Sequence, residues 1–300
     1  MNNLKILDAK LLTKVVEVIY PADERSVQYI PSIFDYASQG IYYCKTPGLT
    51  LSYISGEAIV TANSDVVQVG EYCIYEKAFR PTVEKNIFLD KNLIQSNLEA
   101  GEIYTVKPTI AGRIGKAYSL LGTHSHHWGH FIAEYYPSFL AILPILPEDV
   151  VIILPANLDQ IQIELIKFAL NACSKTNKAC FCPLGQSIVV EQLYVAEKAS
   201  LLSDHSDWIS PYDNIIQSFC NKELLKFSKA VHGGSELGAP RKIFLTRRSG
   251  SRRVSNIDQV ESFFQSNDYE IVDPTLLTHH DRIKLFYACR EVIPPPLNLS

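Results

Sequence analysis

The sequence contains no uninterrupted apolar run of the roughly 18 residues that a membrane-spanning helix requires. Its N-terminus also lacks the pattern of a signal peptide. Charged residues interrupt the apolar stretch at Asp8, Lys10 and Lys14, and no small-residue cleavage site follows. These absences predict a cytoplasmic protein.

An excess of positive charge is also missing, since the net charge is −4. A general nucleic-acid binder needs surplus Lys and Arg to neutralise phosphates, so nucleic acid is not expected as a partner. The seven cysteines are odd in number and form no CxxC pair, which argues against a disulfide framework. We interpret the cluster of Cys173, Cys180 and Cys182 as reduced and structural.

Hydrophobic residues make up 47% of the chain and charged residues 20%, close to the values of globular proteins. Residues 40–80 are rich in β-branched and aromatic residues broken by Gly, Asn, Asp and Ser, which predicts strands. We therefore expect a β-rich N-terminal portion over residues 1–115.

Residues 116–235 alternate between helical and strand patterns, which predicts an α/β lobe with a parallel sheet. A helix is expected from His127 to Leu146, kinked or ended near Pro137. The further expected elements are a strand at 150–154, a helix at 158–171, a strand at 188–195 and a helix at 212–230.

Residues 231–240 have the composition of a linker, and residues 236–300 then predict a βαβαβ unit, half of a Rossmann-like lobe. Asn256 is expected to cap its first helix with Gln259 as capping-box partner, and Thr278 with Asp281 to open the second. The predicted elements are strands at 242–245, 269–272 and 291–293, with a helix reaching about residue 267.

Four of the eight histidines lie within seven positions, at His124, His126, His127 and His130. His130 and Glu134 are spaced i, i+4, so they share one face of a helix. A carboxylate beside an imidazole suits a general base, but the pair could equally staple the helix. His126 and His130 also have a spacing that zinc accepts, although no second ligand pair accompanies them.

Four arginines lie within the seven residues RRSGSRR (247–253), between an expected strand and an expected helix. Helix N-termini attract phosphate, and the forked guanidinium group matches phosphate oxygens. The alternative is a basic surface loop. No GxxxxGK motif occurs, so the segment is not a P-loop.

These two segments resemble glycosyltransferase family 61. HFIAEYYPSF (130–139) is similar to the family's His-Phe-x-x-Asp-x-x-Pro segment, with Glu134 at the acidic position. IFLTRRSGSRRVSN (243–256) and the residues after it are similar to the family's strand–Arg-Arg–Arg–Asn block. Together the similar segments span about residues 120–293.

The resemblance implies a GT-B-like α/β fold of two Rossmann-like lobes, a nucleotide-sugar donor such as a UDP-sugar, and a glycan or lipid-linked glycan acceptor. It implies no metal and no other cofactor. His130 and Glu134 are the expected catalytic residues. The expected donor-binding residues are Arg247, Arg248, Arg253 and Asn256.

The family's third strand leads into a Gly-Pro-His-Gly turn, whereas this chain has PPPLNLS (294–300). Proline offers no backbone N–H to a phosphate, so the donor-binding lobe is expected to be incomplete. Three functions follow from these patterns. The first is an inverting hexosyl- or pentosyltransferase of capsular, extracellular or lipopolysaccharide synthesis, cytoplasmic or peripheral at the inner membrane face. The alternatives are an inactive scaffold and a metal-dependent hydrolase using the His124–His130 cluster.

Overall fold

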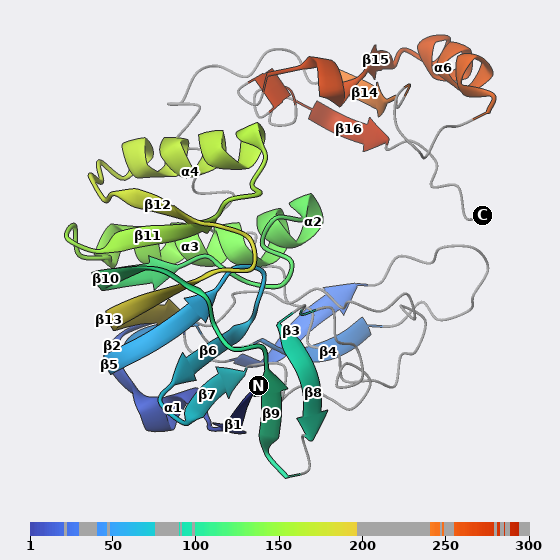
Figure 1. Cartoon of the computed structure of the whole chain (residues 1–300). Coiled ribbons are helices and arrows are strands. Elements are labelled where there is room, and N and C mark those ends of the chain that lie inside the picture. The colour runs from blue at the N-terminus through green and yellow to red at the C-terminus, as the bar shows by residue number, and fades with distance from the viewer. Residues whose placement is uncertain are drawn as a thin grey trace. The chain divides into compact units, whose positions relative to one another are not determined.

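The computed structural model describes residues 1–20, 23–29, 41–46, 49–75, 90, 92–97, 100–196, 241–246, 248, 255–278, 281–282, 285 and 289–293. The fold is mixed α/β, with one large sheet and few helices among these residues (Figure 1). The chain divides into two compact units, Met1–Leu224 and Leu225–Ser300. Within the described ranges, no helix is long and apolar enough to cross a membrane.

The first half of the large sheet is mainly antiparallel. Its strands are β1 (Asn2–Ile6), β2 (Thr13–Tyr20), β5 (Leu49–Thr61), β6 (Val66–Val69), β7 (Tyr72–Tyr75), β8 (Leu93–Asn97) and β9 (Glu102–Thr105), and the short helix α1 (Ala9–Leu12) precedes β2. The order is β5-β6-β7-β1-β9-β8, with β2 paired to β5. A separate hairpin joins β3 (Asp23–Tyr29) to β4 (Ile41–Thr46). The strands expected at 40–80 are thus present where the residues are described.

The second half of the sheet is parallel. It consists of β10 (Ile110–Ser119), β11 (Val151–Pro155), β12 (Ala179–Cys182) and β13 (Ser187–Ala196), in the order β12-β11-β10-β13. In chain order this is 3-2-1-4, which is the Rossmann arrangement. Strand β13 pairs antiparallel with β5 and joins the two halves. The sequence-based boundary at residue 115 falls inside β10.

Side chains that alternate along these strands form the core of the first unit. Ile54, Val60, Ile153, Val190 and Leu193 are all nearly inaccessible to solvent. Cys182 at the end of β12 is also buried, and burial raises the pKa of its thiol to about 11. A neutral, buried thiol fits the expected structural role.

The helices of the first unit follow the predicted pattern with one difference. One continuous helical segment comprises α2 (Trp128–His130), the π-helix η3 (Phe131–Tyr135), α3 (Tyr136–Ile142) and the 3₁₀-helix η4 (Leu143–Ile145), and α4 (Gln160–Ala172) follows β11. Of the two outcomes expected near Pro137, a kink or an end, the helix does not end there but continues from η3 into α3. The Tyr136 hydroxyl donates to the Leu165 carbonyl at 3.1 Å, so α3 packs beside α4. The helix expected at 212–230 lies outside the described residues.

The second unit contains a small parallel sheet. Its elements are β14 (Arg241–Leu245), α6 (Ile257–Gln265), β15 (Glu270–Val272), the 3₁₀-helix η5 (Pro274–Leu276) and β16 (Cys289–Ile293). The strand order is β15-β14-β16, or 2-1-3, and not the consecutive order of half a Rossmann fold. The hydrophobic pattern identified the three strands and the first helix correctly, while much of the expected second helix lies outside the described residues. The pattern carries no information on which strands are neighbours.

The second unit has its own core. Ile243 and Phe244 on β14 are fully buried, and Phe244 stacks on Phe264 of α6 with ring centroids 4.3 Å apart. At Thr278, where a second helix is expected to begin, the hydroxyl accepts a hydrogen bond from the backbone N–H of Asp281 and donates one to that residue's carboxylate. The contact between Phe244 and Phe264 shows that α6 packs against β14 through its apolar face.

Candidate functional site

The histidine-rich segment forms two consecutive turns that lead from β10 into α2. The Gly122 carbonyl accepts both the backbone N–H and the hydroxyl of Ser125, at 3.2 and 2.9 Å. The backbone N–H of His127 then donates to the His124 carbonyl at 2.9 Å. These bonds hold the segment in one conformation after the strand ends.

Gln162 attaches these turns to α4. Its side-chain oxygen accepts the backbone N–H of Asp159, and the Asp159 carboxylate accepts the backbone N–H of Gln162, which completes a capping box. Its amide nitrogen donates to the His126 carbonyl at 3.2 Å. Gln162 is fully buried, so one side chain both caps the helix and fixes the histidine-rich turn.

The four imidazoles pack against one another. The ring centroids of His124 and His130 are 4.5 Å apart, and those of His126 and His127 are 4.2 Å apart. Partial desolvation, followed by the nearby His124 and His130, lowers the pKa of His127 below its ordinary value. The arrangement therefore disfavours protonation of the exposed member of the cluster.

The π-helix η3 places Glu134. The backbone N–H of Tyr136 donates to the Phe131 carbonyl five residues earlier, and Pro137 has no N–H with which to continue the α-helical ladder. Proteins often use such π-turns at functional sites. The Ser138 hydroxyl donates to the Glu134 carbonyl at 2.9 Å and supports the backbone at this point.

Glu134 contacts His130 as the i, i+4 spacing predicts. A Glu134 carboxylate oxygen lies 3.4 Å from His130 Nδ1. The Glu134 side chain is 3% exposed and that of His130 is 19% exposed. A buried carboxylate that touches an imidazole can accept a proton from a substrate hydroxyl group or orient the imidazole to do so.

Glu134 lines a cavity of about 130 Å³ in the first unit. It is also lined by residues at and just after the end of β10 (Tyr118, Ser119, Leu120 and Leu121) and at the end of β13 (Leu193, Val195 and Ala196). The strand order of the parallel half changes direction between β10 and β13. Ligands of open α/β sheets bind beside the carboxyl ends of strands at such a point.

Two further residues of this cavity carry no sequence signal. Tyr135 donates its hydroxyl to Asp65 Oδ1 at 3.3 Å, and both side chains line the cavity. Their partnership spans 70 positions, and Asp65 follows a strand of the β-rich portion. Gly122 leaves room for this tyrosine, because a Cβ atom at this position would lie 2.2 Å from the Tyr135 hydroxyl oxygen unless one of the two residues moved.

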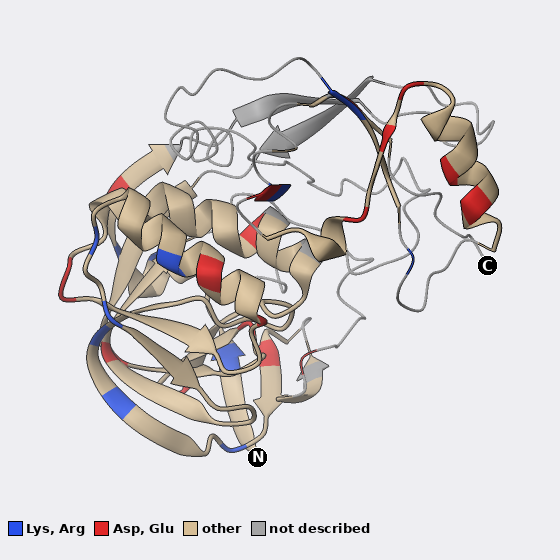
Figure 2. Ribbon diagram, turned by 90° about the horizontal axis from the view of Figure 1, so that it is seen from above, with Lys and Arg blue, Asp and Glu red and all other residues tan. Residues whose placement is uncertain are grey.

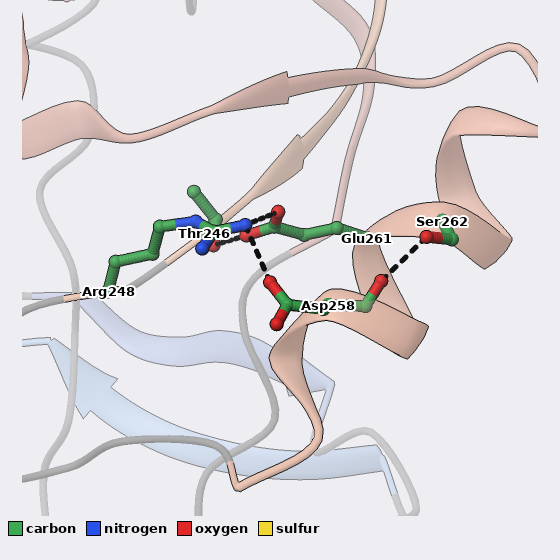
Figure 3. Close-up of polar contacts among 5 residues, drawn as sticks. All are labelled: Thr246, Arg248, Asp258, Glu261 and Ser262. Atoms are coloured by element: carbon green, nitrogen blue, oxygen red, sulfur yellow. Dashed lines mark hydrogen bonds and ion pairs between the residues drawn. The ribbon is translucent and has the colours of Figure 1, made fainter.

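The second unit places Arg248 just beyond the carboxyl end of β14. Its Nη2 atom pairs with the Asp258 carboxylate at 3.0 Å and with Glu261, both on α6 (Figure 3). Glu261 is buried and also accepts a hydrogen bond from the Thr246 hydroxyl. Figure 2 shows acidic residues along α6. Arg248 therefore joins the end of the strand to the helix that follows it.

The other expected donor-binding residues have different outcomes. Asn256 occupies the N-cap position of α6, but its side chain makes no capping hydrogen bond, so the predicted capping box with Gln259 is wrong. The backbone N–H of Gln259 instead donates to the Asn256 carbonyl. Arg247 and Arg253 lie outside the described residues, as do the linker 231–240 and the terminal PPPLNLS. Their roles, and that of Arg248, remain predictions.

The histidine cluster does not have the geometry of a metal site. In the part of the chain that the structure describes, no group of three or more His, Cys, Asp or Glu side chains is arranged to hold a metal ion. Nothing in this geometry favours the metal-dependent hydrolase.

A comparison with protein families identifies a family that this chain matches. The family model described as Glycosyltransferase 61 matches residues 128–295, more than half of the chain. The matched region begins at α2, includes His130 and Glu134, and ends just after β16. A comparison with curated proteins gave no significant match.

Proposed function

Because the chain belongs to the glycosyltransferase 61 family, we propose that it is an inverting enzyme that moves a hexosyl or pentosyl group from a nucleotide-sugar donor, a UDP-sugar, to a hydroxyl group of a glycan acceptor. The family itself implies glycosyltransferase activity with a sugar donor and an acceptor. One observation carries the proposed chemistry: the buried Glu134 carboxylate lines a cavity at the ends of two parallel strands and contacts His130.

In the proposed reaction the acceptor oxygen forms a bond to the anomeric carbon as the bond from that carbon to the phosphate oxygen breaks. The acceptor proton passes to the Glu134 carboxylate, which His130 orients. The uridine diphosphate leaves with the bonding electron pair. Attack from the face opposite the leaving group inverts the anomeric configuration.

Arg247, Arg248, Arg253 and Asn256 are the proposed donor-binding residues. Positive charge near the β-phosphate would stabilise the leaving group as its negative charge develops. The two ion pairs of Arg248 both use Nη2, so Nη1 and Nε are the atoms through which it would reach a phosphate. The position of Arg248, after a strand and before a helix of a parallel sheet, supports this role.

The remaining parts of the proposal extend the family resemblance. The two units would form a GT-B arrangement, with the acceptor on the first and the donor on the second. The pathway would be synthesis of capsular or extracellular polysaccharide or of lipopolysaccharide. The protein would work in the cytoplasm or bound peripherally at the inner face of the membrane, where a lipid-linked glycan is accessible.

The test is glycosyl transfer from a panel of UDP-sugars by wild type and by Glu134→Gln, at equal folded concentration. We expect Glu134→Gln to lower the rate by about 10²- to 10⁴-fold, since this is the usual contribution of a general base. Binding of uridine diphosphate should be unchanged. NMR of the product should show an inverted anomeric carbon. Equal rates would remove Glu134 from the mechanism, and no turnover by wild type would favour an inactive scaffold.

The donor-binding residues are tested by titrating uridine diphosphate into the full chain. Arg248→Ala and Arg253→Ala should each weaken its binding by about tenfold, as expected for loss of a charge-assisted hydrogen bond. Arg241→Ala is the matched control. Arg241 lies at the opposite end of β14 and pairs with Glu270 at 2.9 Å. A similar loss of affinity in all three variants would point to a nonspecific charge effect.

A further inference from the structure

The cavity beside Glu134 has a lining that selects for a particular ligand chemistry. Carboxylates line it at Asp65 and Glu134, and none of the described residues around it is Lys, Arg or His. Among the described residues that line the cavity, an anion would meet two carboxylates and no Lys or Arg, and His130 contacts Glu134 from outside this lining. Such a charge arrangement disfavours phosphates and uronic acids.

The remaining lining combines hydroxyl groups, aliphatic carbon and two tyrosines, Tyr118 and Tyr135. Ser119 at the end of β10 contributes a hydroxyl group, while Val67, Ile74 and Val195 contribute aliphatic surface. A sugar ring has the complementary pattern, with hydroxyl groups at its edge and C–H groups on its faces. Carboxylates accept hydrogen bonds from hydroxyl groups, and such charge-assisted bonds are among the stronger ones.

The size of the cavity also fits. Its volume of about 130 Å³ is several times the share of liquid volume that one water molecule occupies. The cavity is therefore large enough to enclose much of one ring, but not a folded peptide or a nucleotide. The ring would lie beside Glu134, which is where the reacting hydroxyl group must be.

Asp65, which lies outside both of the family-like segments, is held in place by two hydrogen bonds. The Tyr135 hydroxyl donates to Asp65 Oδ1, and the backbone N–H of Asp65 donates to the buried Asp90 carboxylate at 3.0 Å. The absence of a side chain at Gly122 makes room for the Tyr135 ring. Three separate parts of the chain thus fix one carboxylate at the cavity wall.

We propose that this cavity binds the neutral sugar ring of the acceptor, with Asp65 as a specificity-determining residue that accepts hydrogen bonds from ring hydroxyl groups and Tyr135 as a positioning residue that holds Asp65. The inference rests on the proposed function only where it names the bound ring as part of the acceptor. The binding of a neutral, polyhydroxylated ring in the cavity stands independently of catalysis.

The test uses the full chain without a donor. Methyl glycosides of glucose, galactose, mannose and xylose, together with glucuronate, serve as probes in saturation-transfer NMR and competition titrations. At least one neutral glycoside should bind wild type, and glucuronate should bind about tenfold more weakly than the glucoside. Asp65→Asn should weaken the neutral ring about tenfold and reduce the difference between glucoside and glucuronate.

Tyr135→Phe removes only the hydroxyl group that reaches Asp65 and should weaken the ring severalfold. Its matched control is Tyr104→Phe, because the Tyr104 hydroxyl makes the same kind of contact with Glu102 at 3.2 Å but lies outside the cavity. The control should bind as wild type does. Melting temperatures of all variants show whether each one is folded.

The inference is overturned if no neutral glycoside binds wild type, if Asp65→Asn leaves binding unchanged, or if glucuronate binds as tightly as the glucoside. The outcome for the proposed function is separate. If glycosyl transfer depends on Glu134 but the acceptor KM is the same in Asp65→Asn as in wild type, only the assignment of the cavity is refuted. Ring binding that depends on Asp65, without any transfer by wild type, would sink only the proposed function.

Discussion

Replacing Gly122 by alanine should disrupt the wall of the cavity and destabilise the first unit. The added Cβ atom would lie 2.2 Å from the Tyr135 hydroxyl oxygen and 2.7 Å from two ring carbons. Tyr135 is 5% exposed, so its ring has no solvent into which it can move freely. Overpacking of this kind costs about 1–3 kcal/mol, and loss of the hydrogen bond to Asp65 adds about 1 kcal/mol. The expected loss of unfolding free energy is therefore about 2–4 kcal/mol.

Hydrogen exchange in peptides that cover η3 and α3 measures this effect locally, since each 1.4 kcal/mol is about a tenfold faster exchange. Gly112→Ala is the matched control, because a Cβ atom there meets nothing within 4 Å. It should leave exchange unchanged or slow it. Combining Gly122→Ala with Tyr135→Phe should recover part of the loss, as the nearest clashing atom is removed. If Gly122→Ala exchanges like Gly112→Ala, the close approach of Tyr135 does not exist in solution.

Two other predictions concern the histidine-rich turn. Gln162→Glu should lower the unfolding free energy by at least about 1–3 kcal/mol, because the His126 carbonyl would lose its donor and a carboxylate would occupy a fully buried position, while the helix cap keeps its acceptor. Thermal unfolding measures this, and an unchanged melting temperature would contradict it. The pKa of His127 is lowered, so the unfolded chain binds more protons than the folded one between that pKa and the ordinary value near 6.5. The free energy of unfolding should thus rise with pH through this window, and His127→Gln should abolish this dependence. A His127 NMR titration midpoint at or above the ordinary value would refute the reasoning.

The sequence predicts well the features that arise from local periodicity. The helix after Asp159, the strand at 151–155 and the contact between His130 and Glu134 all depend on residues a few positions apart. Local patterns of this kind determine which backbone groups and side chains can meet. The hydrogen bond from the backbone N–H of Asp281 to Thr278 Oγ1 depends on an equally short spacing.

The sequence predicts poorly the features that depend on distant pairing. Asp65 and Tyr135 meet only because β10, β13 and β5 are neighbours in one sheet, which no local pattern reveals. The sequence indicates a kink or an end near Pro137 but not the π-helix at Glu134, because a proline reveals that a backbone donor is missing and not which hydrogen bond replaces it. Asn256 occupies the N-cap position, but its side chain forms no capping hydrogen bond. Its backbone, at φ −111° and ψ 34°, is not in the extended conformation that directs an N-cap side chain to the helix.

Strand β5 has a consequence for how the chain is made. Thr61 at its end meets Ser187 of β13 through hydroxyl groups 2.8 Å apart, across 126 positions of sequence. A ribosome adds about 5–20 residues per second, so roughly 6 to 25 s pass between the synthesis of β5 and that of its neighbour. During this interval the edge of β5 that later pairs with β13 is open to pairing with other nascent strands. Production of this protein should therefore be sensitive to translation speed and to chaperones that shield strand edges, even under conditions in which the finished fold is stable.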